Sequence, residues 1–242
     1  MKYVISDLHG YPHERFLQLL EKAGFNEKDN LYILGDAIDC TGDGGIETVR
    51  WISKQPNVVY IRGEHECGFS EYLKEEALTD EYIKNGGYVT LRSLEELSKR
   101  LRDEAKQVIE EIFDAATAVN IGLSIDGKCF FLYHGCVGRR YITIEDVLRE
   151  VLCKNAPDSE LWSALDIEND LDECERFFGP PTVVFGHTPT ALLGCEYAGK
   201  IIRTNQWIDI DTGVCLGYEP VLLRLDDMTE FRHENAECDG KY

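Results

Sequence analysis

The sequence predicts an α/β domain, and three observations support that class. Short runs rich in β-branched and aromatic residues recur along the chain, and each stops abruptly at polar residues next to a glycine. A helical pattern separates the first two of these runs, which is the order expected of parallel strands joined by a crossover helix. The 242 residues are 43% hydrophobic, which is ample for the core of one large domain.

The predicted strands share one theme, since each delivers ionisable residues at its end. They are "KYVIS" before "DLHG", "LYIL" before "GDAID", "VVYI" before "RGEHE", "CFFLY" before "HG" and "TVVF" before "GHT". Between the first two, "HERFLQLLEKAG" predicts a helix, because Phe16, Leu19, Leu20 and Ala23 line one face and Gly24 can cap its end. We therefore expect parallel pairing at the start of the sheet.

The segment from about 69 to 118 is charged and favours helix. Ser93 and Glu96 resemble a capping box, and apolar residues then repeat at spacings of three and four, which predicts one long amphipathic helix over Leu94, Leu97, Leu101, Ala105, Val108 and Ile112. We expect a helical insertion that serves as packed scaffold, with a lid over a site as the alternative.

Further strands are expected near 119–134, shorter helices between about 144 and 178, and a last β-rich stretch with turn glycines at 213 and 217. This organisation predicts a single domain over 1–227, including the insertion, and a polar C-terminal tail over 228–242.

Composition narrows the function classes. A net charge of -20 would repel phosphate backbones, which argues against nonspecific nucleic-acid binding and against anionic membranes. No apolar run approaches the roughly 20 residues of a membrane span, and the start lacks the pattern of a signal peptide. The nine cysteines include no CxxC pair, so we expect buried thiols in a reducing compartment and a cytoplasmic protein.

The residues at the strand ends are the candidates for chemistry. Ligands of open α/β sheets bind beyond the carboxyl ends of the strands, where residues distant in sequence converge. Four of the six histidines lie at such positions beside carboxylates, whereas an isolated histidine is more often a core residue. The candidates are Asp7, His9, Asp36, Asp39, Glu64, His65, His134 and His187.

So many carboxylates in one crevice would repel one another without cations between them. A mixture of imidazole and carboxylate without thiolate suits Mn²⁺ first, with Fe or Zn²⁺ as alternatives. If Asp36 bridges, its two oxygens can hold a pair of ions about 3.5 to 4 Å apart. The second ion would then be bound by Glu64, His134 and His187.

Together, "DLHG", "GDAID", "RGEHE", "HG" and "GHT" resemble the calcineurin-like metallophosphoesterase superfamily. Within it, the chain resembles the bacterial relatives of the serine/threonine phosphoprotein phosphatases. The resemblance runs from Lys2 to about Leu225, and "NGGYVTLRSL" is also similar to diadenosine tetraphosphate hydrolases, while "IDIDTG" resembles the strand after the family's last histidine. It implies a calcineurin-like α/β/β/α sandwich of two mixed sheets with flanking helices, and a dinuclear metal site at one edge.

The resemblance also implies roles. Asp7, His9 and Asp36 would bind the first metal, and Asp36 would bridge to a second held by residue 64, His134 and His187. A metal-bridging hydroxide would attack phosphorus directly. The catalytic residues would be His65, as general acid, and Asp39, which orients His65 and keeps it cationic. Arg62 would hold phosphate, and Glu66 would support the site from behind.

Three departures from the family pattern concern substrate binding. The family has Asn where this chain has Glu64, and an arginine that clamps phosphate where it has Cys40. A further family arginine, expected in "LWSALD", is absent beside Trp162. Such losses weaken the grip on a phosphomonoester, because guanidinium matches phosphate geometry. Arg139 and Arg140 either compensate or lie on a surface loop.

These observations leave three functions open. The first is a phosphatase for phosphomonoesters, including phosphoserine or phosphothreonine in proteins. The second is a phosphodiesterase or dinucleoside polyphosphate hydrolase, for which fewer clamps on one terminal phosphate are an advantage. The third is a weakly active member that binds a phosphorylated partner or acts as a scaffold. The expected partner in each case is a phosphorylated protein or small molecule.

Overall fold

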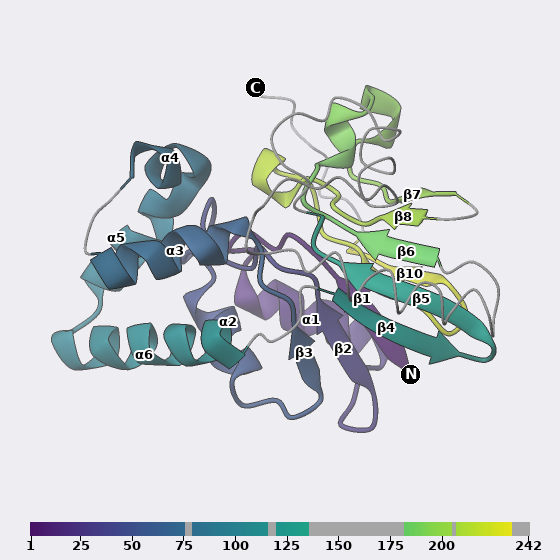
Figure 1. Cartoon of the computed structure of the whole chain (residues 1–242), viewed down its shortest axis with the longest axis horizontal. Helices are drawn as coiled ribbons and strands as arrows, with labels where there is room; N and C mark the ends of the chain where they lie inside the picture. The colour runs from purple at the N-terminus through teal and green to yellow at the C-terminus, as the bar shows by residue number, and fades with distance from the viewer. Residues whose placement is uncertain (76–78, 116–119, 136–181, 205–206, 234–242) are drawn as a thin grey trace.

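The computed structural model describes residues 1–75, 79–115, 120–135, 182–204 and 207–233. Two five-stranded sheets carry this part of the chain (Figure 1). A group of helices lies to one side of them, at the left of Figure 1. The architecture is the predicted one of two mixed sheets with flanking helices.

The first sheet has the strand order β10-β9-β1-β2-β3. β1 pairs parallel with β2, and β2 pairs parallel with β3, which confirms the parallel start predicted from the sequence. β9 runs antiparallel to β1, and β10 runs antiparallel to β9. The strands are β1 (Lys2–Ile5), β2 (Asn30–Ile33), β3 (Val58–Tyr60), β9 (Leu222–Arg224) and β10 (Thr229–Phe231).

The second sheet has the order β4-β5-β6-β8-β7. Its centre is parallel, from β5 through β6 to β8, and its edge strands β4 and β7 are antiparallel to their neighbours. The strands are β4 (Asn120–Ile125), β5 (Lys128–Tyr133), β6 (Thr182–Phe185), β7 (Ile202–Arg203) and β8 (Trp207–Asp209). Three short 3-10 helices follow β6 and β8, namely η2 (Thr190–Leu192), η3 (Cys195–Tyr197) and η4 (Val214–Leu216).

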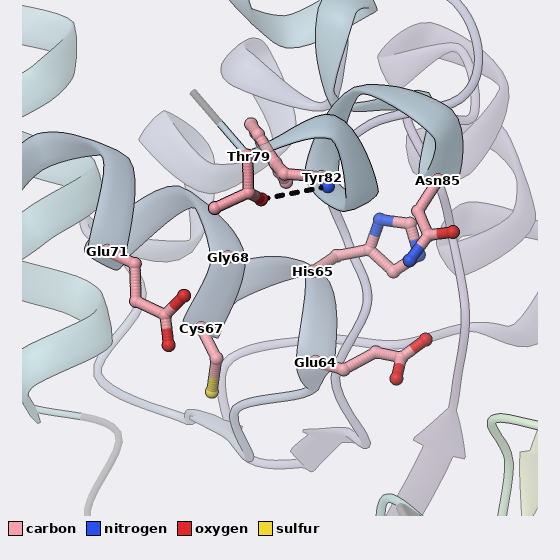
Figure 2. A pocket seen from close by; sticks show the side chains of 8 residues that line it. All are labelled: Glu64, His65, Cys67, Gly68, Glu71, Thr79, Tyr82 and Asn85. Carbon is pink, nitrogen blue, oxygen red and sulfur yellow. Dashed lines mark hydrogen bonds between the residues drawn. The ribbon is translucent and has the colours of Figure 1, made fainter. Parts of the chain in front are cut away.

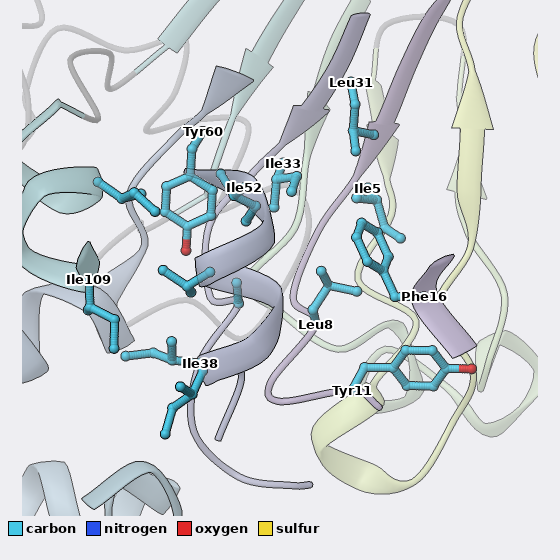
Figure 3. Packing of buried hydrophobic residues seen from close by; sticks show 14 of the residues in the cluster. Ile5, Leu8, Tyr11, Phe16, Leu31, Ile33, Ile38, Ile52, Tyr60 and Ile109 are labelled. Carbon is cyan, nitrogen blue, oxygen red and sulfur yellow. The ribbon is translucent and has the colours of Figure 1, made fainter. Parts of the chain in front are cut away.

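Strand alternation divides the core into two layers. Val4 of β1 joins a cluster with Leu132 and Val184 of the second sheet, so the two sheets pack face to face. Its neighbours Tyr3 and Ile5 point to the other face of β1 and join the cluster under the helices. Figure 3 shows that second layer, in which strand, loop and helix residues meet.

Within the described residues, the apolar layer on the outer face of the first sheet includes buried residues of α1 (His13–Ala23), α2 (Ile46–Ile52) and α6 (Lys99–Ala115). α1 buries the predicted face, and it ends at Gly24, whose φ of 73° is left-handed. None of the helices in the described residues is both long enough and apolar enough to cross a bilayer.

The predicted single long helix is wrong, because the chain breaks between Glu96 and Lys99. The helical segment consists of α3 (Glu64–Glu75), α4 (Asp80–Tyr82), the π-helical turn η1 (Ile83–Gly87), α5 (Tyr88–Glu96) and α6. Leu97 is extended, with ψ of 148°, and the Arg102 side chain donates to the carbonyls of Leu94, Glu95 and Leu97. These bonds give hydrogen-bond partners to the backbone carbonyls at the end of α5. Ser93 lies inside α5 and therefore caps no helix.

Two further expectations differ from the structure. Residues 229–231, assigned to the polar tail, form β10 on the edge of the first sheet, because Phe231 packs against the apolar layer under the helices. Among the described cysteines, Cys195 is exposed and Cys129 is disulfide-bonded, so they are not uniformly buried thiols. The division into a domain over 1–227 and a tail stays a prediction, as do the helices expected at 144–178, which lie outside the described residues.

Candidate metal centre and active site

The candidate site lies beyond the carboxyl ends of β1, β2, β3, β5 and β6. Each of these strands is followed within a few residues by one or more of the predicted site residues, and the structure brings their side chains together although they span positions 7 to 187. The convergence follows from the parallel pairing, which aligns strand ends at one edge.

The backbone at these strand ends is strained. Non-glycine residues with left-handed φ angles gather there: Asp7 (53°), His9 (43°), Asp36 (49°), Asp39 (73°), Cys40 (58°) and His187 (71°). Such conformations are costly for residues with a Cβ atom, and they persist where surrounding contacts impose them. The His9 N–H donates to the Asp36 carbonyl at 2.8 Å, and the Asp7 N–H donates to the Gly35 carbonyl at 3.1 Å, which ties the first two loops together.

The first ligand group consists of Asp7, His9 and Asp36, all buried, whose ligand atoms lie within 4.8 Å of one another. His9 Nε2 is 3.9 Å from Asp7 Oδ1. Asp7 Oδ2 is used otherwise, because it accepts the His187 N–H at 3.0 Å and the Ser6 hydroxyl. Asp7 Oδ1 is therefore the oxygen left for a cation.

The second group consists of Asp36, His134 and His187, again within 4.8 Å. His134 Nδ1 donates to the Leu34 carbonyl, which directs Nε2 toward Asp36 Oδ2 at 3.4 Å. Asp36 thus belongs to both groups, as the bridging prediction requires.

Glu64 begins α3 at the rim of this cluster. Its side chain is 42% exposed, and Oε1 lies 4.0 Å from His187 Nδ1. Its ligand oxygen also falls within 4.8 Å of ligand atoms of Asp36 and His65. Glu64 is therefore placed to approach an ion on the His187 side.

Charges in the cluster balance one another through protons. Burial, opposed by His134, raises the pKa of Asp7 to about 7. Burial lowers the pKa of His134, but the neighbouring Asp36 charge outweighs it and raises that pKa to about 10. Conversely, the imidazoles overcome burial and hold the pKa of Asp36 well below its usual value. A cation between these groups would replace the positive charge that the protons supply.

The donor set fits divalent metal ions. Asp7 Oδ1, His134 Nε2 and His187 Nδ1 are buried atoms without a hydrogen-bond partner among the described residues. A buried polar atom left unpaired is costly, and these three point into the two ligand groups. Imidazole nitrogen and carboxylate oxygen are ligands of Mn²⁺, Fe and Zn²⁺.

His65 and Asp39 form a second buried unit beside the ligands. His65 Nδ1 lies 2.9 Å from Asp39 Oδ2, and Nε2 lies 4.0 Å from Asp36 Oδ2. Burial lowers the pKa of His65, but Asp36 and Asp39 outweigh it and raise that pKa to about 9. The imidazole therefore carries a proton that Nε2 can donate.

A pocket opens next to His65, between α3 and the turns of α4 and η1 (Figure 2). Figure 2 shows Glu64 and His65 at the start of α3, with Thr79, Tyr82 and Asn85 on the facing turns. The lining mixes polar and apolar surface and includes two acidic residues: Glu64, His65, Cys67, Gly68, Glu71, Thr79, Tyr82 and Asn85. Its position places a group held there next to the histidine that can protonate it.

The structure describes only some of the residues predicted to bind phosphate or to replace a phosphate-binding residue of the family. Arg62 is partly buried, and its Nε has no partner in the part of the chain that is described. Cys40 occupies the place of the family's arginine, with Sγ 3.6 Å from His9 Nδ1 and donating to the Asn85 carbonyl at 3.4 Å. Arg139, Arg140 and the region around Trp162 lie outside the described residues.

Sequence reasoning missed two residues that contact Asp39. Tyr82 and Thr90 are buried in the helical segment, and both hydroxyls bond its carboxylate. Thr90 falls within the "NGGYVTL" stretch that is similar to diadenosine tetraphosphate hydrolases, so a signal existed. Nothing local in the sequence, however, links either residue to Asp39.

Comparisons with known proteins agree with this geometry. The profile of the calcineurin-like phosphoesterase family matches residues 3–215. A symmetrical bis(5'-nucleosyl)-tetraphosphatase of Buchnera aphidicola subsp. Acyrthosiphon pisum (strain Tuc7) is 32% identical over 117 residues, which are 44% of this chain and 42% of that protein. The chain thus matches less than half the length of this curated relative.

Two solved structures share the fold. One is a putative diadenosine tetraphosphatase, with a TM-score of 0.57 and 13% identity, covering 96% of this chain and 92% of that one. The other is a protein serine/threonine phosphatase from Saccharomyces cerevisiae with similarity to human phosphatase PP5, with a TM-score of 0.53 and 14% identity, covering 97% and 80%.

Proposed function

The chain belongs to the calcineurin-like phosphoesterase family, and we propose that it hydrolyses phosphoric anhydrides and esters of small molecules at two metal ions, with dinucleoside polyphosphates as the first substrate class. As a member of this family it is a metal-dependent phosphoester hydrolase. The observation that carries the dinuclear proposal is the position of Asp36, whose carboxylate has an oxygen within 4.8 Å of the ligand atoms of both the first and the second group.

Each residue has a defined part in this proposal. Asp7, His9 and Asp36 would hold one ion, and Asp36, His134, His187 and Glu64 would hold the other. When bound, two such ions polarise the phosphoryl oxygens and lower the pKa of water toward neutrality. Arg62 would bind a phosphoryl oxygen beside them.

The leaving oxygen needs a proton, and His65 is the candidate donor. Its Nδ1–H is held by Asp39 at 2.9 Å, which leaves Nε2 to face the substrate. The leaving group would occupy the pocket lined by His65 and Tyr82. The proposal uses water, activated by the bound ions, as the nucleophile in place of a side chain. It therefore includes no covalent phosphoenzyme.

Two observations support dinucleoside polyphosphates over phosphoproteins. The Buchnera relative and one of the solved structures with the same fold are named for this activity. In addition, Cys40 replaces a guanidinium that would clamp the dianionic end of a monoester. An internal phosphate of a polyphosphate carries fewer charged oxygens and depends less on such a clamp.

Phosphomonoesters are the second candidate. The pocket beside His65 carries Glu64 and Glu71, which favour an uncharged alcohol over an anionic nucleotide as leaving group. The third candidate, a weakly active phospho-ligand binder, draws support from the same substitutions at Cys40 and Glu64.

A substrate panel separates these functions. The protein is stripped with a chelator, reconstituted with Mn²⁺, Fe²⁺ or Zn²⁺, and assayed on p-nitrophenyl phosphate, its bis-ester and diadenosine tetraphosphate. Preferential turnover of diadenosine tetraphosphate supports the proposal. Preferential turnover of the monoester would contradict it and favour the second candidate, a phosphomonoesterase. Metal binding without turnover of any substrate supports the third. His13→Gln is the control variant, because it replaces a histidine at the start of α1 that is not among the proposed site residues.

We expect Mn²⁺ as the native ion, a phosphorylated small molecule as partner, and the cytoplasm as the compartment. Metal analysis of freshly purified protein tests the first expectation. A preparation that contains only zinc would contradict it.

A further inference from the structure

The helical segment reaches into the candidate site through two hydroxyl groups on Asp39. We infer that Tyr82 and Thr90 are positioning residues for the general acid, because they hold the Asp39 carboxylate in the orientation that directs His65. This inference rests on the proposed function and deepens it, since it makes protonation of the leaving group depend on α4 and α5.

The two oxygens of Asp39 have separate tasks. Oδ2 accepts the His65 Nδ1–H at 2.9 Å. Oδ1 accepts the Tyr82 hydroxyl at 3.0 Å and the Thr90 hydroxyl. The carboxylate is fully buried, so these groups replace the water that would otherwise solvate Oδ1.

Thr90 also holds the backbone of Asp39. Its Oγ1 accepts the Asp39 N–H at 3.1 Å, at a residue whose φ of 73° is left-handed. A single threonine thus contacts both the strained backbone and the carboxylate of Asp39. Such paired contacts stabilise a conformation that a non-glycine residue rarely adopts.

The helical turns leave Tyr82 little freedom. A Cβ atom at Gly87 would lie 2.4 Å from the Tyr82 ring, and one at Gly68 would lie 2.8 Å from it. The backbone of Tyr82 is fixed as well, because its N–H donates to the Thr79 hydroxyl at 3.1 Å. The ring therefore points its hydroxyl at Asp39 from a rigid position.

The same segment also holds the residue after Asp39. The Cys40 N–H donates to the Gly86 carbonyl at 3.2 Å, and a Cβ atom at Gly44 would lie 2.4 Å from the Thr90 Cα. The loop after β2 and the helical segment thus interlock on both sides of Asp39. A movement of α4 or α5 would be transmitted to the carboxylate and to His65.

The first test is Tyr82→Phe, which removes one hydroxyl and keeps the ring. Turnover is compared on phenyl phosphate, whose leaving oxygen needs a proton, and on p-nitrophenyl phosphate, whose leaving anion is stable; the bis-esters serve if the wild type prefers diesters. Loss of one hydrogen bond to Asp39 is expected to lower kcat about threefold to tenfold on the phenyl ester. The nitrophenyl ester should change less than about twofold, with KM unchanged for both.

Tyr88→Phe is the matched control, because Tyr88 is 56% exposed on α5 and lies outside the Asp39 contacts. Thr90→Val should reproduce the leaving-group effect, and Thr90→Ser, which retains the hydroxyl, should restore the wild-type ratio of the two substrates. A merely structural role would lower turnover of both substrates equally and would leave their ratio unchanged in every variant.

A second readout does not depend on turnover. The His65 Nδ1 proton should give a low-field NMR signal that His65→Asn removes. Tyr82→Phe should accelerate its exchange with water by about tenfold or more, and Tyr88→Phe should not. An unchanged exchange rate together with an unchanged substrate ratio would overturn the inference while the proposed function stands. A wild-type protein inactive on all esters and on diadenosine tetraphosphate would instead remove the proposed function.

Discussion

Glu66 holds the loop that carries Asp36. The Asp36 N–H donates to Glu66 Oε2 at 2.9 Å, and the Glu66 side chain is fully buried. The same carboxylate accepts the N–H groups of Gly63 at 2.7 Å and of Ala37 at 3.0 Å. One side chain therefore joins the loop after β2 to the start of α3, where Glu64 and His65 lie.

Glu66→Gln should destabilise the protein, because an amide offers one acceptor oxygen where two are used. At least one buried N–H would lose its partner, at a cost of about 1–3 kcal/mol in the free energy of unfolding. Urea denaturation measures the effect, with Glu95→Gln on the exposed side of α5 as the control. A loss no larger than that of the control would show that Glu66 does not support this loop.

Asp36→Asn should release metal from both groups, because Asp36 is the ligand that they share. An amide has one oxygen and no charge, and we expect metal affinity to fall at least about 100-fold, the upper end of the loss seen when a supporting partner of a ligand is removed. Metal content after dialysis measures this, and Asp126→Asn, in the turn between β4 and β5, is the control. Retention of both ions by Asp36→Asn would refute the bridging role.

Two substitutions separate the parts that Glu64 can play. Glu64→Ala removes the carboxylate oxygen that lies 4.0 Å from His187 Nδ1 and should weaken binding of the second ion about tenfold to 100-fold. Glu64→Asn keeps an oxygen ligand and removes a negative charge beside an anionic substrate, so kcat/KM should rise about threefold to tenfold. Titration calorimetry and steady-state kinetics measure the two effects. A fall in kcat/KM for Glu64→Asn would mean that the carboxylate itself is the working ligand.

Cys40→Arg should improve the binding of monoesters. It restores a guanidinium at the family's clamp position, and a charge-assisted hydrogen bond contributes about 1.5–3 kcal/mol. We expect the KM for p-nitrophenyl phosphate to fall about tenfold, while diadenosine tetraphosphate changes little. Because Cys40 contacts the Asn85 carbonyl, Cys40→Ser serves as the control that removes the thiol without adding charge. Equal changes for both substrates would argue against a clamp specific to monoesters.

The sequence alone predicted that the candidate site residues converge, because strands and the polar residues that follow them are local signals. Asp7, Asp36 and His134 each follow a β-rich run, and parallel pairing brings such positions to one edge. The α1 helix was predictable for the same reason, since its apolar spacing and Gly24 cap lie within twelve consecutive residues.

Only the tertiary structure decided what supports that site. Tyr82 and Thr90 bond Asp39 across 43 and 51 residues, and no local periodicity encodes a contact over that separation. The same holds for the break at Leu97, where Arg102 binds the carbonyls at the end of α5 in place of a continued helix. Strand ends are specified by nearest neighbours in the chain, whereas the orientation of a buried carboxylate depends on whichever donors the completed fold places around it.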